Sequence, residues 1–324
     1  MKTVKNKIIS SYKNGNYNVT IFEDGTKIRE NDQDFFDADR PESIDCTVTY
    51  KCTIGCPYCY QGCTKNGITC NYKDPIIETF LEGMEVAIGA SSGVFDDDKG
   101  KSFESFLRKL KRKKCIPSIT VNQYHLIKHI DIIKKWIKQK LVYGVGVSIS
   151  QGLRNYTKLS SVLFNLKEEN LHNNIVLHTI AGIHTIKDFE KISGIFKADY
   201  KPKVLILGYK NIGRGKNYLK QLPEDVLKNI NELKDNIKKI ANLYTVCSFD
   251  NPACIQLELK NKYSNVWNER YLGDDGSHTF YLDLAKRTFS ISSLHEESYP
   301  IDEFKSIEEM FLFVKEKSKL SICK

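Results

Sequence analysis

The chain has 324 residues, of which 41% are hydrophobic, and this is enough to bury one large α/β core or two smaller ones. Its apolar runs are short, as in "VLILG" at 204–208, so we expect no membrane-spanning segment. The N-terminus lacks the apolar core of a secretory signal, which predicts a cytoplasmic protein. Ten cysteines in a reducing compartment favour metal or redox chemistry over disulfides.

Residues 8–30 alternate between apolar and polar side chains around two turn signals, Asn14-Gly15 and Asp24-Gly25. Such alternation with Asn-Gly and Asp-Gly pairs is typical of β-hairpins. The sequence therefore predicts an N-terminal β-meander within residues 1–43.

From residue 44 the pattern changes to strand, loop and helix, repeated six times, with apolar runs suited to burial on both faces of a sheet. Such alternation indicates a parallel sheet, and the spacing favours a barrel. We therefore predict an α/β fold whose core is a partial (β/α)6 barrel of the TIM-barrel kind over residues 44–241. The expected strands are 44–50, 85–89, 117–123, 143–150, 174–182 and 203–210, and the expected helices are 75–83, 102–114, 126–140, 157–169, 185–196 and 223–241.

The remainder of the chain, 242–324, reads as a mainly β C-terminal extension with α/β character. "LYTVCSFD" and "CIQLELK" resemble short strands, and residues 273–294 resemble a hairpin. An amphipathic helix is expected over 302–319. With no low-complexity linker in between, we expect this extension to pack compactly against the core.

Four cysteines follow the first core strand within twelve residues: Cys52, Cys56, Cys59 and Cys63. The first three could form a buried helical stripe, but Gly55 and Pro57 lie between them, and a proline would break the helix. A loop is therefore favoured, and such a loop can curl several sulfurs around one centre. Thiolates suit either zinc or an iron–sulfur cluster, and the spacing leaves both open.

A Cys-x3-Cys-x2-Cys loop with Tyr58 before its last cysteine, placed after the first strand of a βα barrel, resembles the radical S-adenosylmethionine superfamily. The resemblance covers roughly residues 44–240, and the tail around "LGDDGSHTFYLDL" resembles uncharacterised members from phages and mobile elements. It implies that Cys52, Cys56 and Cys59 hold one [4Fe–4S] cluster, which leaves one iron open for S-adenosylmethionine. Cleavage of that molecule would then generate a 5′-deoxyadenosyl radical, with electrons from a donor such as flavodoxin or ferredoxin. The alternative is a zinc-stabilised binding protein in which Cys63 completes a four-thiolate site.

The same resemblance implies contacts to S-adenosylmethionine near the ends of the strands. The family's Gly-Gly-Glu-Pro stretch is replaced here by "IGASSG" at 88–93, so only its first glycine is retained. His178 or Thr179 could line the cavity, although a lone histidine in a strand is more often a satisfied core residue. The glycines around Arg214 could either hold an anionic group or form a turn. The implied cofactor-binding residues are Tyr58, Gly89, Ser91, Asn122, Ser148, Ser150 and Gly208.

Two substrate classes are compatible with the sequence. The net charge of +9 favours a macromolecule, either RNA or a peptide, although a solvated helix face explains much of the excess charge. A small metabolite inside the barrel is the alternative. Helix 102–114 is the candidate RNA surface, with Arg108, Lys111, Arg112 and Lys114 as contacts.

Overall fold

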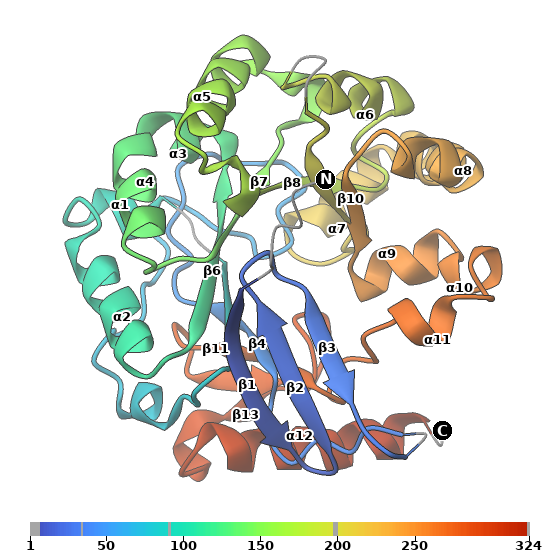
Figure 1. Cartoon of the computed structure of the whole chain (residues 1–324). Helices are drawn as coiled ribbons and strands as arrows, with labels where there is room; N and C mark the ends of the chain where they lie inside the picture. The colour runs from blue at the N-terminus through green and yellow to red at the C-terminus, as the bar shows by residue number, and fades with distance from the viewer. Residues whose placement is uncertain (1–6, 34, 90–91, 197–199, 323–324) are drawn as a thin grey trace.

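The computed structural model describes residues 7–33, 35–89, 92–196 and 200–322, with Ser91 outside these ranges. Its main feature is a ten-stranded sheet, which runs through the molecule behind the N-terminal strands in Figure 1. The strand order is β10-β9-β8-β7-β6-β5-β4-β11-β12-β13. The strands are β4 (Ser43–Thr47), β5 (Glu85–Gly89), β6 (Ile116–Asn122), β7 (Gly144–Ser148), β8 (Ile175–Ile180), β9 (Lys203–Leu207), β10 (Val246–Phe249), β11 (Thr279–Asp283), β12 (Thr288–Ser290) and β13 (Tyr299–Pro300).

All neighbouring pairs from β10 across to β11 are parallel, which confirms the predicted parallel sheet. The sheet is not closed, however: within the described residues, β10 and β13 are its two edges and do not pair with each other. The barrel prediction is corrected to an open sheet. Alternation of strands and helices indicates parallel pairing, but closure depends on strand tilt and register, which the pattern does not carry.

Helices connect successive parallel strands and form an outer layer around the sheet (Figure 1). One expected helix, at 75–83, is instead a short 3-10 turn over Pro75–Thr79, whose backbone is capped by the Asp74 carboxylate. The connecting helices are α1 (Gly93–Asp96), α2 (Lys101–Arg112), α3 (Gln123–Lys128), α4 (Ile130–Lys138), α5 (Tyr156–Glu168), α6 (Ile186–Ser193), α7 (Arg214–Gln221) and α8 (Pro223–Ala241).

The two faces of the sheet differ in burial. Along β6, Ile119 and Val121 are buried in the core that also contains Leu107 of α2, whereas Thr120 and Asn122 are half-buried. Because side chains alternate along a strand, the helices cover one face and leave the other partly open. The expectation of burial on both faces is therefore wrong. The half-open face is polar along β6, whereas along β8 and β9 it also carries apolar side chains such as Ile180 and Leu207.

The N-terminal meander forms as predicted from β1 (Ile8–Asn14), β2 (Tyr17–Phe22) and β3 (Lys27–Glu30). Its second turn, around Gly25, lies against the first residues of the central strands, where Glu85, Gly144 and Lys203 line the same cavity of about 300 Å³. The meander therefore covers the amino ends of the parallel strands and leaves their carboxyl ends free.

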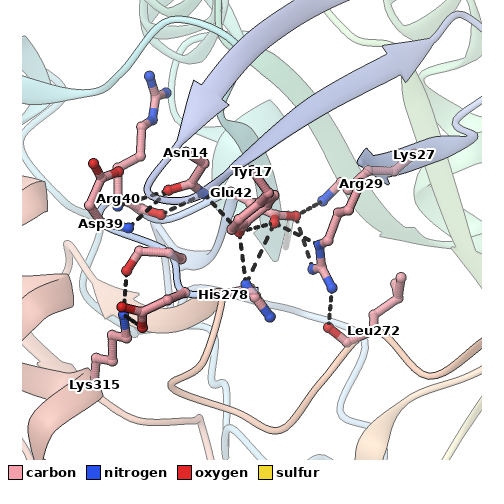
Figure 2. Close-up of polar contacts among 12 residues, drawn as sticks. Asn14, Tyr17, Lys27, Arg29, Asp39, Arg40, Glu42, Leu272, His278 and Lys315 are labelled. Carbon is pink, nitrogen blue, oxygen red and sulfur yellow. Dashed lines mark hydrogen bonds and ion pairs between the residues drawn. The ribbon is translucent and has the colours of Figure 1, made fainter. Parts of the chain in front are cut away.

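A buried carboxylate fastens the meander to the central sheet (Figure 2). Glu42, which directly precedes β4, is fully buried and accepts hydrogen bonds from Tyr17 Oη at 2.6 Å and Arg29 Nε at 2.7 Å. Lys27 Nζ lies 3.1 Å from Glu42, and His278 Nδ1 lies 3.0 Å from Tyr17 Oη. Burial alone would raise the pKa of Glu42, but Lys27 and Arg29 lower it to about 2. The carboxylate therefore stays ionised and paired.

The C-terminal part joins the central sheet through β11, which pairs in parallel with β4 and forms the predicted hairpin with β12. The expected strand at "CIQLELK" is helical instead, because Asp250 caps the first turn and Pro252 follows at a position suited to a helix start. Ile255 in this segment is 77% exposed, so its alternation with Leu257 does not mark a sheet face.

The helices of this part are α9 (Asn251–Gln256), α10 (Leu259–Lys262), α11 (Trp267–Arg270) and α12 (Ile307–Ile322), the last of which matches the helix expected at 302–319. None of the described helices is both long and apolar enough to cross a membrane.

Candidate functional site

The four-cysteine segment forms a loop at the carboxyl end of β4, as predicted. Two isolated bridges, Thr49 with Thr69 and Lys51 with Thr64, close the base of this loop, and Cys52 N donates to Thr64 O at 2.8 Å. Ligands of parallel α/β folds bind at the carboxyl ends of strands, so the loop occupies the functional edge of the sheet.

The thiols of the loop fall into two groups. Cys52, Cys56 and Cys59 are half-buried, whereas Cys63 is only 4% exposed and its sulfur lies 3.6 Å from Gln61 Oε1. Burial raises the pKa of Cys56 to about 11, while a hydrogen bond from Cys63 lowers the pKa of Cys59 to about 6. The three half-buried thiols are thus distinguished from Cys63 by exposure.

The donor set suits an iron–sulfur cluster, although the sulfurs are not gathered around one point. Cys59 N donates to Cys56 O at 3.2 Å within the loop, and Cys52, Cys56 and Cys59 form no disulfide. Across the described residues, no three Cys, His, Asp or Glu side chains form a group that could hold a metal ion. Binding through all three thiols therefore requires their side chains to turn toward a shared centre.

Tyr58 connects the cysteine loop to two other segments. Its hydroxyl accepts a hydrogen bond from Gln151 N at 3.3 Å, just beyond β7, and its ring packs edge-to-face on Tyr218 of α7 at 5.8 Å. The structure thus brings the predicted Tyr58 next to the segment that carries the predicted Ser150.

Three of the predicted contacts lie on the strand ends at this edge. Gly89 ends β5, and Asn122 and Ser148 are directly paired at the ends of β6 and β7. Asn122 Oδ1 accepts from Tyr124 N at 3.0 Å and so caps α3, which leaves its amide nitrogen for a ligand. These side chains share one edge with the cysteine loop, and their contact with S-adenosylmethionine stays a prediction.

The other two described positions are held by protein contacts. Ser150 N donates to Gln123 Oε1 at 3.0 Å, and Gly208 N donates to Asp250 Oδ1 at 2.7 Å. A Cβ on Gly208 would lie 2.6 Å from the backbone of Ala253, so this glycine permits close packing of α9. Gly208 is therefore buried by α9 instead of lying open to a ligand.

His178 departs from the expected satisfied core residue. It lies on the half-open face beside Ser148, and its ring occupies the space above Gly146, where a Cβ would come within 2.2 Å of Cε1. Burial lowers its pKa to about 4, so the ring is neutral. Its buried Nδ1 has no hydrogen-bond partner among the described residues, which leaves a polar atom available at this face.

Sequence reasoning missed a charged group beneath the cysteine loop. Lys210 Nζ lies 4.4 Å from the centre of the Tyr60 ring, and its charge acts on the carboxylates of Asp45, Asp250 and Asp275. The Asp45 side chain reaches solvent, yet desolvation by the protein packed around it raises its pKa to about 6. The charge of Lys210 opposes this shift. An aspartate inside the core strand "IDCTVTY" was the signal that could have revealed this group.

A pocket of about 200 Å³ opens beside the loop, between Tyr60 and Gln61 on one side and the β11–β12 hairpin on the other. Hydroxyl groups dominate its lining: Tyr281 Oη donates to Thr47 Oγ1 at 2.8 Å, and Tyr50 Oη donates to Asp283. The C-terminal part of the chain therefore contributes one wall of the candidate site.

The fold is that of an α/β protein with a large parallel sheet and a cysteine-bearing loop at the carboxyl end of its first core strand. It is similar to Streptococcus suis SuiB, solved in complex with S-adenosylmethionine, with a TM-score of 0.59 and 11% identity over 85% of this chain. SuiB solved with its precursor peptide SuiA gives a TM-score of 0.58 and 12% identity over 84% of this chain. The two alignments cover 66% and 65% of the SuiB chain, so this chain spans just under two thirds of SuiB. No protein-family model and no curated protein sequence matches the chain.

Proposed function

We propose that this protein is a radical S-adenosylmethionine enzyme that binds one [4Fe–4S] cluster through Cys52, Cys56 and Cys59. The observation that carries the proposal is the position of this three-cysteine loop at the carboxyl end of β4, in a fold similar to that of a protein solved with S-adenosylmethionine. The cluster would supply the electron that cleaves the sulfonium and generates a 5′-deoxyadenosyl radical, with flavodoxin or ferredoxin as the external donor.

The chain's own residues would bind and orient the cosubstrate. Asn122 and Ser148 offer polar atoms at the strand ends beside the loop, and such groups suit the amino, carboxylate and ribose parts of S-adenosylmethionine. Cys63 is excluded from the ligand set in this proposal because it is buried and bonded to Gln61. The C-terminal hairpin contributes one wall of the pocket beside the loop, and radical chemistry would require that water be excluded there.

A peptide is the substrate class that we favour over RNA. SuiB has been solved with a precursor peptide on a similar fold. Three cations of the candidate RNA surface contact groups of this chain at its surface. Arg108 Nη2 lies 2.7 Å from Glu104, Lys111 Nζ donates to Gln139 O at 2.7 Å, and Lys114 Nζ lies 2.8 Å from Glu82. Such exposed contacts are what a solvated helix face makes without any partner, so they do not call for a nucleic acid. A small metabolite is the alternative substrate, and the deuterium-transfer experiment described below distinguishes it from a peptide.

The test is anaerobic reconstitution with iron and sulfide. We expect about four irons per chain and broad visible absorption, which should be lost in Cys52→Ala, Cys56→Ala and Cys59→Ala and kept in the matched control Cys63→Ala. Reduced protein should convert S-adenosylmethionine into 5′-deoxyadenosine and methionine. Stoichiometric zinc that is lost in Cys63→Ala would instead support the zinc-stabilised binding protein.

The substrate class is tested by deuterium transfer. Reduced, cluster-loaded protein is incubated in turn with uniformly deuterated short peptides, RNA and small metabolites from cell extract. Deuterium should enter 5′-deoxyadenosine from the peptide fraction, and transfer confined to RNA or to metabolites would overturn the peptide assignment.

A further inference from the structure

Arg214, at the start of α7, is joined to the cysteine loop by three hydrogen bonds. Its backbone N donates to Cys59 O at 3.0 Å, its Nε to Cys56 O at 2.9 Å and its Nη1 to Cys63 O at 2.7 Å. All three acceptors are backbone carbonyls of the loop, which lies about 150 residues earlier in the chain. A single residue thus fixes the loop at three points.

The glycines on either side of Arg214 make this approach possible. Gly213 has φ of 55° and ψ of −134°, and a Cβ there would lie 2.1 Å from Tyr60 O. A Cβ on Gly215 would lie 2.4 Å from Lys210 O and 3.5 Å from Tyr58 O. Only glycine allows the two backbones to come so close.

The Gly-Arg-Gly sequence could hold an anionic group or form a turn, and in the structure its guanidinium bonds to carbonyls of the protein. Two of its nitrogens point to carbonyls of residues that carry the loop thiols. Arginine stays charged at every accessible pH, so this contact places a permanent positive charge beside the thiols. The loop also contains Gly55 and Gly62 at φ of 70° and 64°, so without an external anchor it has many accessible conformations.

We infer that Arg214 is a positioning residue that holds the cysteine loop in place and raises the reduction potential of the cluster bound there. The inference rests on the proposed function, because it assigns a cluster to that loop. One-electron reduction by the external donor adds one negative charge to the cluster and breaks no bond. A fixed cation nearby stabilises the more negative, reduced state, since cluster potentials depend on net charge and hydrogen bonding.

The test compares two substitutions that separate charge from geometry. Arg214→Gln removes the charge, and Arg214→Lys keeps the charge while losing the paired donors. The matched control is Lys216→Gln, which removes an exposed cation two residues away. In redox titrations of reconstituted protein, the potential should become more negative in Arg214→Gln and stay near the wild-type value in Arg214→Lys and Lys216→Gln. Equal reduction potentials in Arg214→Gln and wild type would overturn the inference that the charge of Arg214 raises the potential of the cluster.

Hydrogen exchange on the protein without a cluster tests separately whether Arg214 holds the cysteine loop in place. Amides of residues 52–63 should exchange about 10-fold faster in both Arg214 variants, as expected for the loss of one or two hydrogen bonds. Their exchange rates should be unchanged in Lys216→Gln. Unaltered exchange in Arg214→Gln would overturn the inference that Arg214 holds the loop in place. If the wild-type chain takes up no cluster at all, the proposed function fails, while the exchange measurement still decides whether Arg214 holds the loop.

Discussion

The two ends of the parallel sheet are built in opposite ways. At the amino ends, Glu42 is fully buried and its carboxylate is paired with two cations and a tyrosine hydroxyl. At the carboxyl ends, the cysteine loop keeps three thiols half-buried and is anchored mainly through backbone carbonyls. The first arrangement satisfies its buried charges within the chain, whereas the second leaves reactive groups accessible.

The two ends of the strands therefore carry different kinds of groups. Loss of one member of a buried charge cluster is strongly destabilising, because it leaves the remaining charges buried without their partners. The thiols of Cys52, Cys56 and Cys59 are half-buried, and His178 Nδ1 has no hydrogen-bond partner among the residues that the structure describes. The same separation is known for βα barrels, in which one end carries function and the other stability. The open sheet described above follows this rule without closing.

The largest expected effect comes from breaking the buried pair at the amino end. Glu42→Gln leaves the half-buried Arg29 without a counter-charge, while Lys27 keeps its ion pair with Glu85. The substitution should lower the free energy of unfolding by about 3–5 kcal/mol. Denaturant unfolding of the protein without a cluster measures this loss. The control Glu30→Gln, on the exposed side of β3, should change stability by about 0.5 kcal/mol or less. A similar loss in both variants would contradict the assigned role of Glu42.

A smaller effect is expected from adding one methyl group at the carboxyl end. Gly213→Ala forces a backbone clash with Tyr60 O, and it should cost about 1–3 kcal/mol and speed hydrogen exchange in residues 52–63. Gly25→Ala is the matched control, since Gly25 also has a positive φ but a Cβ there would meet nothing within 4 Å. If both substitutions lower the free energy of unfolding equally and neither changes hydrogen exchange in residues 52–63, the close approach at Gly213 does not position the cysteine loop.

The smallest effect concerns pH at the amino end. Burial and the nearby Arg29 lower the pKa of His278 to about 4. The unfolded chain takes up this proton near pH 6.5 while the folded chain does not, so stability is lost as the pH falls from 6.5 towards 4. The loss is about 1.4 kcal/mol at about pH 5.5. His278→Gln should flatten this part of the profile. His295→Gln, in the C-terminal hairpin region, should leave it unchanged, and a profile equally steep in all three proteins would refute the assignment.

The sequence by itself determined the parts of the structure that depend on local patterns. Asn14-Gly15 and Asp24-Gly25 set the meander turns, and alternating strand and helix patterns indicated the parallel sheet. Gly55 and Pro57 marked the cysteine segment as a loop, and its place after the first core strand put it at the carboxyl edge. Local patterns failed at "CIQLELK", where the side-chain cap from Asp250 outweighed a two-residue alternation.

Only the tertiary structure decided which distant residues meet. Arg214 reaches Cys56 and Cys63 across some 150 residues, and Asp45 shares its surroundings with Lys210 and Asp250, with no local pattern linking them. Whether the sheet closes is decided in the same way, because strand tilt and the packing of β11 against β4 are properties of the whole assembly. Sequence patterns report on neighbours along the chain, whereas the candidate site is assembled from segments that approach each other only when the core packs.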